Sequence, residues 1–241
     1  MSIRSIAALA TCFVLSGCGA TATTADHDQL LQTLTSDLPP GLSIDSINDS
    51  AIPGLLEVRV GPQIFYTTPD AKHLVMGSIM DREAKTDLTA SSVAEVVKGM
   101  LEGVDRSQVQ TYTPKGGAQR RVYVFTDPSC GYCQRFHNEL SELNAAGVEV
   151  VYLGYPREGI GGDSYARLSG AFCNPDRALA FDKIMAGEHP GPSDTCLSPV
   201  DFHYALANRL QVNGTPSIFD DKGRQIGGYL TATDLLTQLE K

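Results

Sequence analysis

One short stretch, Cys130-Gly131-Tyr132-Cys133, constrains the fold more than any other part of the chain. It follows an apolar run at residues 122–125 that predicts a buried strand, and it precedes a helical pattern over residues 134–146. Between the two, a proline ends the strand and Ser129 is a suitable cap for the helix. The sequence therefore predicts a strand, a tight junction and a helix that carries Cys130 in its first turn.

Two cysteines at this spacing predict redox chemistry. The positively polarised start of a helix favours an anion, so the pKa of the Cys130 thiol should fall below its free value of about 8.5. Cys133 lies one turn further on the same face, where it can attack a mixed disulfide formed at Cys130. One alternative is half of a zinc site, but no second close-spaced Cys or His pair is present in the sequence. Another is a structural disulfide, which at this spacing is strained and reducible. We expect no metal and no cofactor.

The N-terminal residues predict export. A single positive charge at Arg4 precedes an apolar run at residues 6–15, which is too short to span a bilayer and is typical of a secretory signal. The run ends in Leu15-Ser16-Gly17-Cys18, which resembles a bacterial lipobox and predicts lipidation of Cys18. The alternative is an ordinary signal peptide cleaved after Ala20-Thr21-Ala22. Either reading places the mature protein outside the cytoplasm.

The cysteines divide evenly once the signal is removed. The chain has six, and loss of Cys12 with the signal and of Cys18 to lipid leaves four, which suggests two pairs in an oxidising compartment. Cys173 and Cys196 flank a helical region, and we interpret them as a structural disulfide that stabilises the fold by about 3 kcal/mol. A second redox pair is the alternative, although these cysteines lack close spacing and a helix start.

The rest of the chain divides into a small and a larger domain. Residues 1–18 form the signal and residues 19–28 a flexible tether. Residues 29–90 predict a short helix at 29–38 followed by an antiparallel β meander, with strands at 43–47, 55–60, 64–68 and 73–79. A domain of this size has little core of its own, so we expect it to oligomerise.

A linker and the second domain follow. Residues 91–117 contain a linking helix at 91–101 and a polar segment at 113–117 that is either a hinge or an ordinary surface loop. In residues 118–241 a second buried strand at 148–153 follows the redox helix. Three helices come next, then Thr215-Pro216, a β hairpin and a final helix at 233–240. The sequence leaves open whether the Thr215–Pro216 bond is cis or trans.

The stretch from Phe125 to Cys133, together with residues 181–187, resembles the DsbC/DsbG family of bacterial thiol:disulfide interchange proteins, and its Gly-Tyr dipeptide is similar to the DsbC branch. The resemblance implies a thioredoxin-like α/β (α+β) fold with an inserted helical region, and a small cystatin-like N-terminal dimerisation domain. It also implies a cis Thr215–Pro216 bond, a homodimer, a periplasmic location and a DsbD-like membrane protein as electron donor. For substrate binding we assign Thr215, Pro216, Gly131 and Tyr132.

We therefore expect Cys130 and Cys133 to isomerise and reduce incorrect disulfides in misfolded exported proteins. The alternatives are a dithiol oxidase, a reductase dedicated to one client, and a non-catalytic chaperone. A formal net charge of −9 argues against a nucleic-acid partner. Two features depart from related proteins: the lipobox-like junction at Cys18, and Val124 at the position where thioredoxin carries a buried acidic residue.

Overall fold

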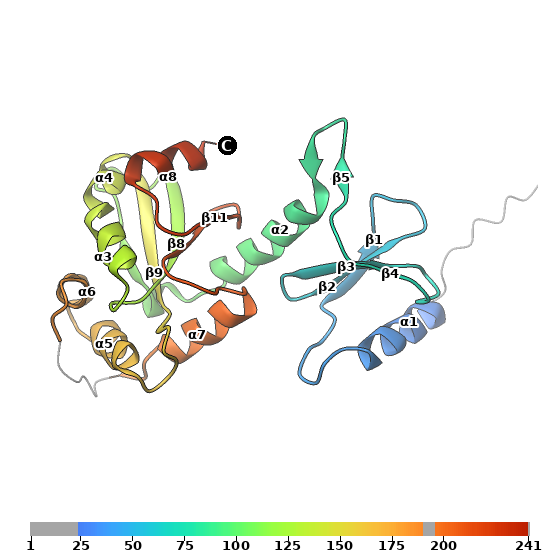
Figure 1. The fold of residues 1–241 in the computed structure, drawn as a ribbon, viewed down its shortest axis with the longest axis horizontal. Coiled ribbons are helices and arrows are strands. Elements are labelled where there is room, and N and C mark those ends of the chain that lie inside the picture. The colour runs from blue at the N-terminus through green and yellow to red at the C-terminus, as the bar shows by residue number, and fades with distance from the viewer. Residues whose placement is uncertain (1–23, 190–195, 241) are drawn as a thin grey trace, which may run out of the picture.

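A computed structural model describes residues 24–189 and 196–240 (Figure 1). It contains two domains that are joined by a long helix, α2 (Leu88–Glu102). The predicted signal, Cys12 and Cys18 lie outside the described residues. Within residues 24–189 and 196–240, no helix has both the length and the apolar character that crossing a membrane requires.

The N-terminal domain is a helix packed on an antiparallel meander, as predicted. Its sheet has the strand order β1-β2-β3-β4, and a short β5–β6 hairpin follows. The elements are α1 (Thr24–Ser36), β1 (Ser46–Asp49), β2 (Leu56–Val60), β3 (Gln63–Thr67), β4 (Leu74–Val75), β5 (Met80–Asp81) and β6 (Thr86–Asp87). The core is small: among the described residues, its buried cluster consists of Leu30, Leu34 and Val58.

Helix α1 starts earlier than the sequence predicts. Residues 24–28, which we expected to belong to a flexible tether, form its first turns. A helix that is nucleated by its apolar face extends at little further cost, so the leucines at 30, 31 and 34 can hold this preceding polar segment in helical form. Any tether is therefore shorter than predicted.

Helix α2 belongs to both domains. It begins before the predicted residue 91 because Asp87 caps it, accepting a hydrogen bond from the backbone N–H of Ala90. Near its start, Thr89 contacts the Tyr66 hydroxyl of the N-terminal sheet at 2.5 Å. Near its end, Val97 and Leu101 are buried in the core of the second domain. The helix is thus a packed structural element rather than a free linker.

The second domain is a five-stranded sheet covered by helices on both faces. The strand order is β11-β10-β8-β9-β7, in which β8 and β9 are parallel and the other neighbours antiparallel. The strands are β7 (Gln110–Tyr112), β8 (Arg120–Thr126), β9 (Val148–Gly154), β10 (Ser217–Asp220) and β11 (Gln225–Gly227). Because successive side chains of a strand point to opposite faces, β8 contributes Val122 and Val124 to one core and Tyr123 and Phe125 to the other.

The helices complete these two cores. Helices α3, α4, α5, α6 and α8 contribute to the first core and α2 to the second, while α7 contributes Val200 to the first and Leu206 and Ala207 to the second. Their bounds are α3 (Gly131–Asn138), α4 (Leu140–Ala145), α5 (Asp163–Phe172), α6 (Arg177–Met185), α7 (Val200–Arg209) and α8 (Ala232–Leu239). The helix predicted at 134–146 is thus two helices, separated at Glu139, and its first turn begins at Gly131.

The boundary between the domains also differs from the prediction. Strand β7 pairs with β9, so the second sheet starts at Gln110 rather than after Gly117. The polar segment at 113–117, interpreted as a hinge, therefore connects two strands of one sheet. Its alternative interpretation, an ordinary loop, fits this position.

Candidate active site

The junction between β8 and α3 is organised by a buried carboxylate. Asp127 is fully buried and accepts hydrogen bonds from the backbone N–H and hydroxyl of Ser129, both at 2.8 Å, and from the hydroxyl of Ser164 at 2.8 Å. Arg157 donates to it through its backbone N–H at 2.9 Å and its Nε at 3.1 Å. Burial alone would raise the pKa of Asp127, but these hydrogen bonds outweigh it and lower the pKa.

This arrangement corrects one prediction. Ser129 does not cap the helix, because its hydroxyl donates to Asp127 and accepts from Arg157 instead. Cys130 itself occupies the N-cap position, with an extended backbone, and no side chain caps the helix there. The sulfur therefore takes the place at the positively polarised helix end that a serine or aspartate oxygen usually occupies.

The two cysteines are held in opposite states. Both are free thiols and buried, with exposed fractions of 4% for Cys130 and 0% for Cys133. The hydrogen bond that the Cys133 thiol donates lowers the pKa of Cys130 to about 5, and the backbone N–H groups at the start of α3 act in the same direction. Burial, together with the hydrogen bond shared with Cys130, raises the pKa of Cys133. Near neutral pH the pair is thus one thiolate and one thiol.

The loop before β10 closes the site on the other side. The peptide bond between Thr215 and Pro216 is cis, as the family resemblance implied. The Cys130 sulfur lies 3.2 Å from the Thr215 carbonyl oxygen, and a protonated Cys130 thiol would donate a hydrogen bond to that oxygen. The structure thus brings four of the predicted residues together, namely both cysteines, Thr215 and Pro216. The other two assigned residues begin α3, where Tyr132 is 55% exposed beside Cys130.

Two buried hydroxyl groups flank the cysteine pair. Thr126 Oγ1 and Thr215 Oγ1 have no other hydrogen-bond partner among the described residues. The Thr215 side chain interacts with Cys130 and helps to lower its pKa, and the Thr126 side chain acts on the pKa of Cys133 in the same way. Sequence reasoning missed Thr126 because a threonine at a strand end is ordinary. Only its burial against a sulfur distinguishes it.

The predicted structural disulfide is present. Cys173 and Cys196 are bonded, with their Cα atoms 5.5 Å apart and a sequence separation of 23. Within the described part of the chain, no three His, Cys, Asp or Glu side chains gather in a metal-binding arrangement.

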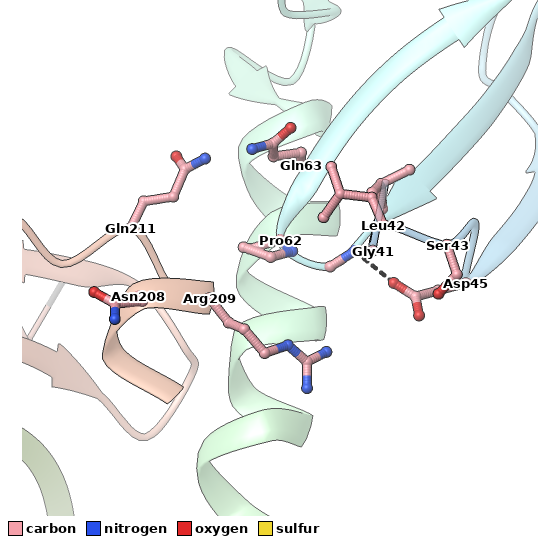
Figure 2. Close-up of a pocket in the computed structure, with 11 residues that line it drawn as sticks. Gly41, Leu42, Ser43, Asp45, Pro62, Gln63, Asn208, Arg209 and Gln211 are labelled. Carbon is pink, nitrogen blue, oxygen red and sulfur yellow. Dashed lines mark hydrogen bonds between the residues drawn. The ribbon is translucent and has the colours of Figure 1, made fainter. Parts of the chain in front are cut away.

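A separate hollow lies between the domains (Figure 2). It has a volume of about 550 Å³ and lies between the β2–β3 turn and the C-terminal end of α7. Asp45 accepts a hydrogen bond from Gly61 on one side, and Arg209 lies on the other. Its lining includes neither cysteine, so it is not part of the redox site.

Comparison with known proteins agrees with the two-domain fold and the cysteine pair described above. A profile described as a thioredoxin-like domain matches residues 107–241, and one described as the disulfide bond isomerase protein N-terminal domain matches residues 21–90. The thiol:disulfide interchange protein DsbC of Dickeya dadantii is 31% identical over 216 residues, which are 90% of this chain and 87% of that protein. The chain belongs to the DsbC family. The DsbC of Pasteurella multocida is 30% identical and covers 90% of this chain and 92% of its own.

The solved structures agree with the DsbC assignment. A disulfide interchange protein from Neisseria gonorrhoeae superimposes with a TM-score of 0.51 at 27% identity, over 57% of this chain and 96% of that one. The predicted family and the thioredoxin-like fold are confirmed. The chain is a DsbC-type thiol:disulfide oxidoreductase, and it carries both domains of the family.

Proposed function

We propose that this DsbC-type protein isomerises incorrect disulfides in exported proteins, with Cys130 as the nucleophile and Cys133 as the resolving thiol. The observation that carries the proposal is the asymmetry of the pair. Cys130 is the N-cap residue of α3 and has a lowered pKa, whereas Cys133 is fully buried and has a raised pKa. A thiolate attacks disulfides and a thiol does not, so this asymmetry fixes the order of the two steps.

The first step forms a mixed disulfide. The Cys130 thiolate attacks one sulfur of a client disulfide, a bond forms between them, and the second client sulfur leaves as a thiolate. If that thiolate attacks another client disulfide and Cys130 is eventually displaced, the client is rearranged with no net transfer of electrons. This sequence of exchanges is isomerisation.

The second possible outcome is reduction. Cys133 loses its proton to the departing client sulfur and attacks Cys130, so that the pair becomes a disulfide and the client gains two electrons. A DsbD-like membrane protein would return the pair to the dithiol. In both outcomes Thr215, Pro216, Gly131 and Tyr132 would hold an extended client segment. The backbone of the loop would act as a pairing strand, although Pro216 has no N–H to donate.

Refolding of scrambled ribonuclease in a glutathione buffer tests this function. We expect the wild-type protein to restore ribonuclease activity and Cys130→Ala to restore none. Cys133→Ala should form the mixed disulfide and accumulate it. Reduction of insulin without unscrambling would favour a dedicated reductase. Net oxidation of dithiol substrates would favour an oxidase, and full function of Cys130→Ala a non-catalytic chaperone.

We further propose a homodimer formed through the N-terminal domain. Strand β4 is at the edge of its sheet, and Leu74, Val75, Met76 and Met80 are exposed around it. An exposed apolar sheet edge is an association site, and the small core of this domain would gain stability from a partner. Met76→Glu should convert the dimer to a monomer in sedimentation velocity. A wild-type monomer at micromolar concentration would contradict the proposal.

Finally, we propose export to the periplasm and a lipid tether at Cys18. The signal-like residues 1–15, the lipobox-like junction and a structural disulfide support this location. Radiolabelled palmitate should enter the wild-type protein and not Cys18→Ser. Incorporation into neither would favour an ordinary cleaved signal peptide.

A further inference from the structure

The aromatic surface next to Cys130 includes a residue, Tyr229, to which the exchange steps give no role. Tyr132, between the two cysteines, is 55% exposed, and its ring stacks on that of Tyr229 with centroids 5.7 Å apart and an interplanar angle of 28°. The Arg135 guanidinium lies 5.4 Å from the Tyr132 ring centroid. We refer to Tyr132 and Tyr229 as the aromatic platform.

Hydrogen bonds hold the Tyr229 side of the platform in place. The Tyr229 hydroxyl donates to Glu139 Oε1 at 3.0 Å, and the other oxygen of the same carboxylate accepts from the backbone N–H of Ala232 at 3.1 Å. Glu139 lies at the break between α3 and α4, so this carboxylate fastens the segment between β11 and α8 onto the redox helix. A side chain that is fixed before binding loses less conformational entropy when it binds a partner.

The platform is continuous with the catalytic groups. Gly228, directly before Tyr229, lies against the cis-proline loop: a Cβ atom placed on it would be 3.7 Å from the Pro216 carbonyl oxygen. Tyr132 follows Cys130 by two positions on α3. The two segments that carry the rings therefore adjoin the nucleophile and the loop that would pair with a client strand.

We propose that the aromatic platform binds the side chain adjoining the client cysteine, and that Tyr229 makes the enzyme prefer an aromatic residue there. The inference rests on the proposed role of Cys130 as nucleophile. In an extended client each residue advances the chain by about 3.3 Å, so the neighbour of a cysteine bonded to Cys130 lies within reach of Tyr132 and Tyr229. Offset stacking on two tyrosine rings favours a planar aromatic side chain over a small polar one.

Two disulfide-bonded peptides that differ in one residue test the proposal, one with phenylalanine and one with serine beside the cysteine. For the wild-type enzyme we expect kcat/KM to be about two- to tenfold higher for the phenylalanine peptide, mostly through KM, as one aromatic contact would give. Tyr229→Phe keeps the ring and should keep the preference. Tyr229→Ala should bring the two values to within about twofold.

Controls separate binding from folding. Tyr204, which stacks on Tyr155 with centroids 5.2 Å apart, offers a matched substitution outside the site, and Tyr204→Ala should keep the full preference. Tyr229→Leu keeps apolar bulk if the alanine variant fails to fold, and it should retain only part of the preference. Equal kcat/KM values in the wild type, or an undiminished preference in Tyr229→Ala, would overturn the inference. If the wild-type enzyme exchanges with neither peptide, the proposed function fails instead.

Discussion

Cys130–Cys133 and Cys173–Cys196 are two cysteine pairs of one domain. The first cysteine of one pair lies at the start of a helix, and the first cysteine of the other lies at the end of one. Cys130 is the N-cap of α3, whereas Cys173 is the C-cap of α5. Because the helix dipole favours negative charge at the N-terminus and disfavours it at the C-terminus, a thiolate is stabilised at Cys130 and destabilised at Cys173. The first pair is thus suited to remain reduced and reactive, and the second to remain bonded.

The number of residues between the two cysteines of each pair adds to this difference between a reactive and a bonded pair. The Cys173–Cys196 bond closes a loop of more than twenty residues, so its loss would release much conformational freedom in the unfolded chain. The Cys130–Cys133 pair closes almost no loop. The comparison teaches that helix position and loop length, rather than the presence of two cysteines, decide whether a pair is catalytic or structural.

The largest predicted effect concerns activity. Cys130→Ala should lower disulfide exchange by about 1000-fold or more, because the nucleophile is lost. The double variant Cys173→Ala with Cys196→Ala should retain wild-type turnover per folded molecule. Insulin reduction, corrected for the folded fraction by circular dichroism, measures both. Comparable losses in the two variants would mean that the pairs do not divide these roles.

The second effect concerns stability. Here the loss of the Cys173–Cys196 pair should matter more than the loss of the Cys130–Cys133 pair. Removing Cys173 and Cys196 should lower the free energy of unfolding by about 3 kcal/mol, the loop-entropy effect for a closure of this length. Cys130→Ala with Cys133→Ala should lower it by no more than about 2 kcal/mol relative to the oxidised wild type, because this pair closes a much shorter loop. Urea denaturation of all three proteins checks this. An unchanged midpoint without the Cys173–Cys196 bond would contradict its structural role.

A third prediction uses pH to isolate Cys130. Folding lowers the pKa of this thiol from 9.0 to about 5, so between these values the unfolded chain binds a proton that the folded chain does not. The free energy of unfolding of the reduced protein, relative to Cys130→Ala, should therefore rise with pH across this window. The slope is at most about 1.4 kcal/mol per pH unit, and the gain is lost as the pH falls through 5.

Iodoacetamide labelling of the reduced protein provides the matching kinetic measurement. The rate at Cys130 should have its midpoint near pH 5, while Cys133, whose pKa is raised, should remain unlabelled near neutral pH. In the stability measurement, the titrating groups outside the cysteine pair are common to both proteins and cancel, and burial, the largest cause of the raised Cys133 pKa, is also present in both. A labelling midpoint near 9 would remove the basis of the mechanism.

Which cysteine pair is reactive and which is structural was largely predictable from sequence. The order of strand, Cys-Gly-Tyr-Cys and helix identified the reactive pair, and the count of cysteines after removal of the signal identified the structural one. Both follow from local patterns. The cis bond at Thr215–Pro216 required the family resemblance, since the local sequence leaves the isomer open.

What the sequence did not predict depends on contacts between distant residues. Ser129 has a helix-capping sequence context, but Asp127, Arg157 and Ser164 form a hydrogen-bond network that takes its hydroxyl away from the helix. Arg157 and Ser164 lie 30 and 37 positions from Asp127, where local patterns give no signal. The platform formed by Tyr132 and Tyr229 is missed for the same reason.

The smallest predicted effect concerns Thr126, which lies beside the resolving thiol. Its hydroxyl is buried and has no partner within residues 24–189 and 196–240 other than Cys133. Valine has nearly the same shape but no hydroxyl. As Cys133 loses its proton to attack Cys130, the negative charge that develops on its sulfur would lack a hydrogen-bond donor in Thr126→Val.

We expect this substitution to slow resolution of the mixed disulfide about fivefold, the effect of a hydrogen bond worth ~1 kcal/mol. Attack by Cys130 should be unaffected, because Thr126 acts on the pKa of Cys133. Rapid quenching with acid, followed by mass spectrometry of the trapped intermediate, separates the two steps. Thr126→Ser keeps the hydroxyl and should resolve at close to the wild-type rate. If Thr126→Ser and Thr126→Val were equally slow, the methyl packing of Thr126 rather than its hydroxyl would control Cys133.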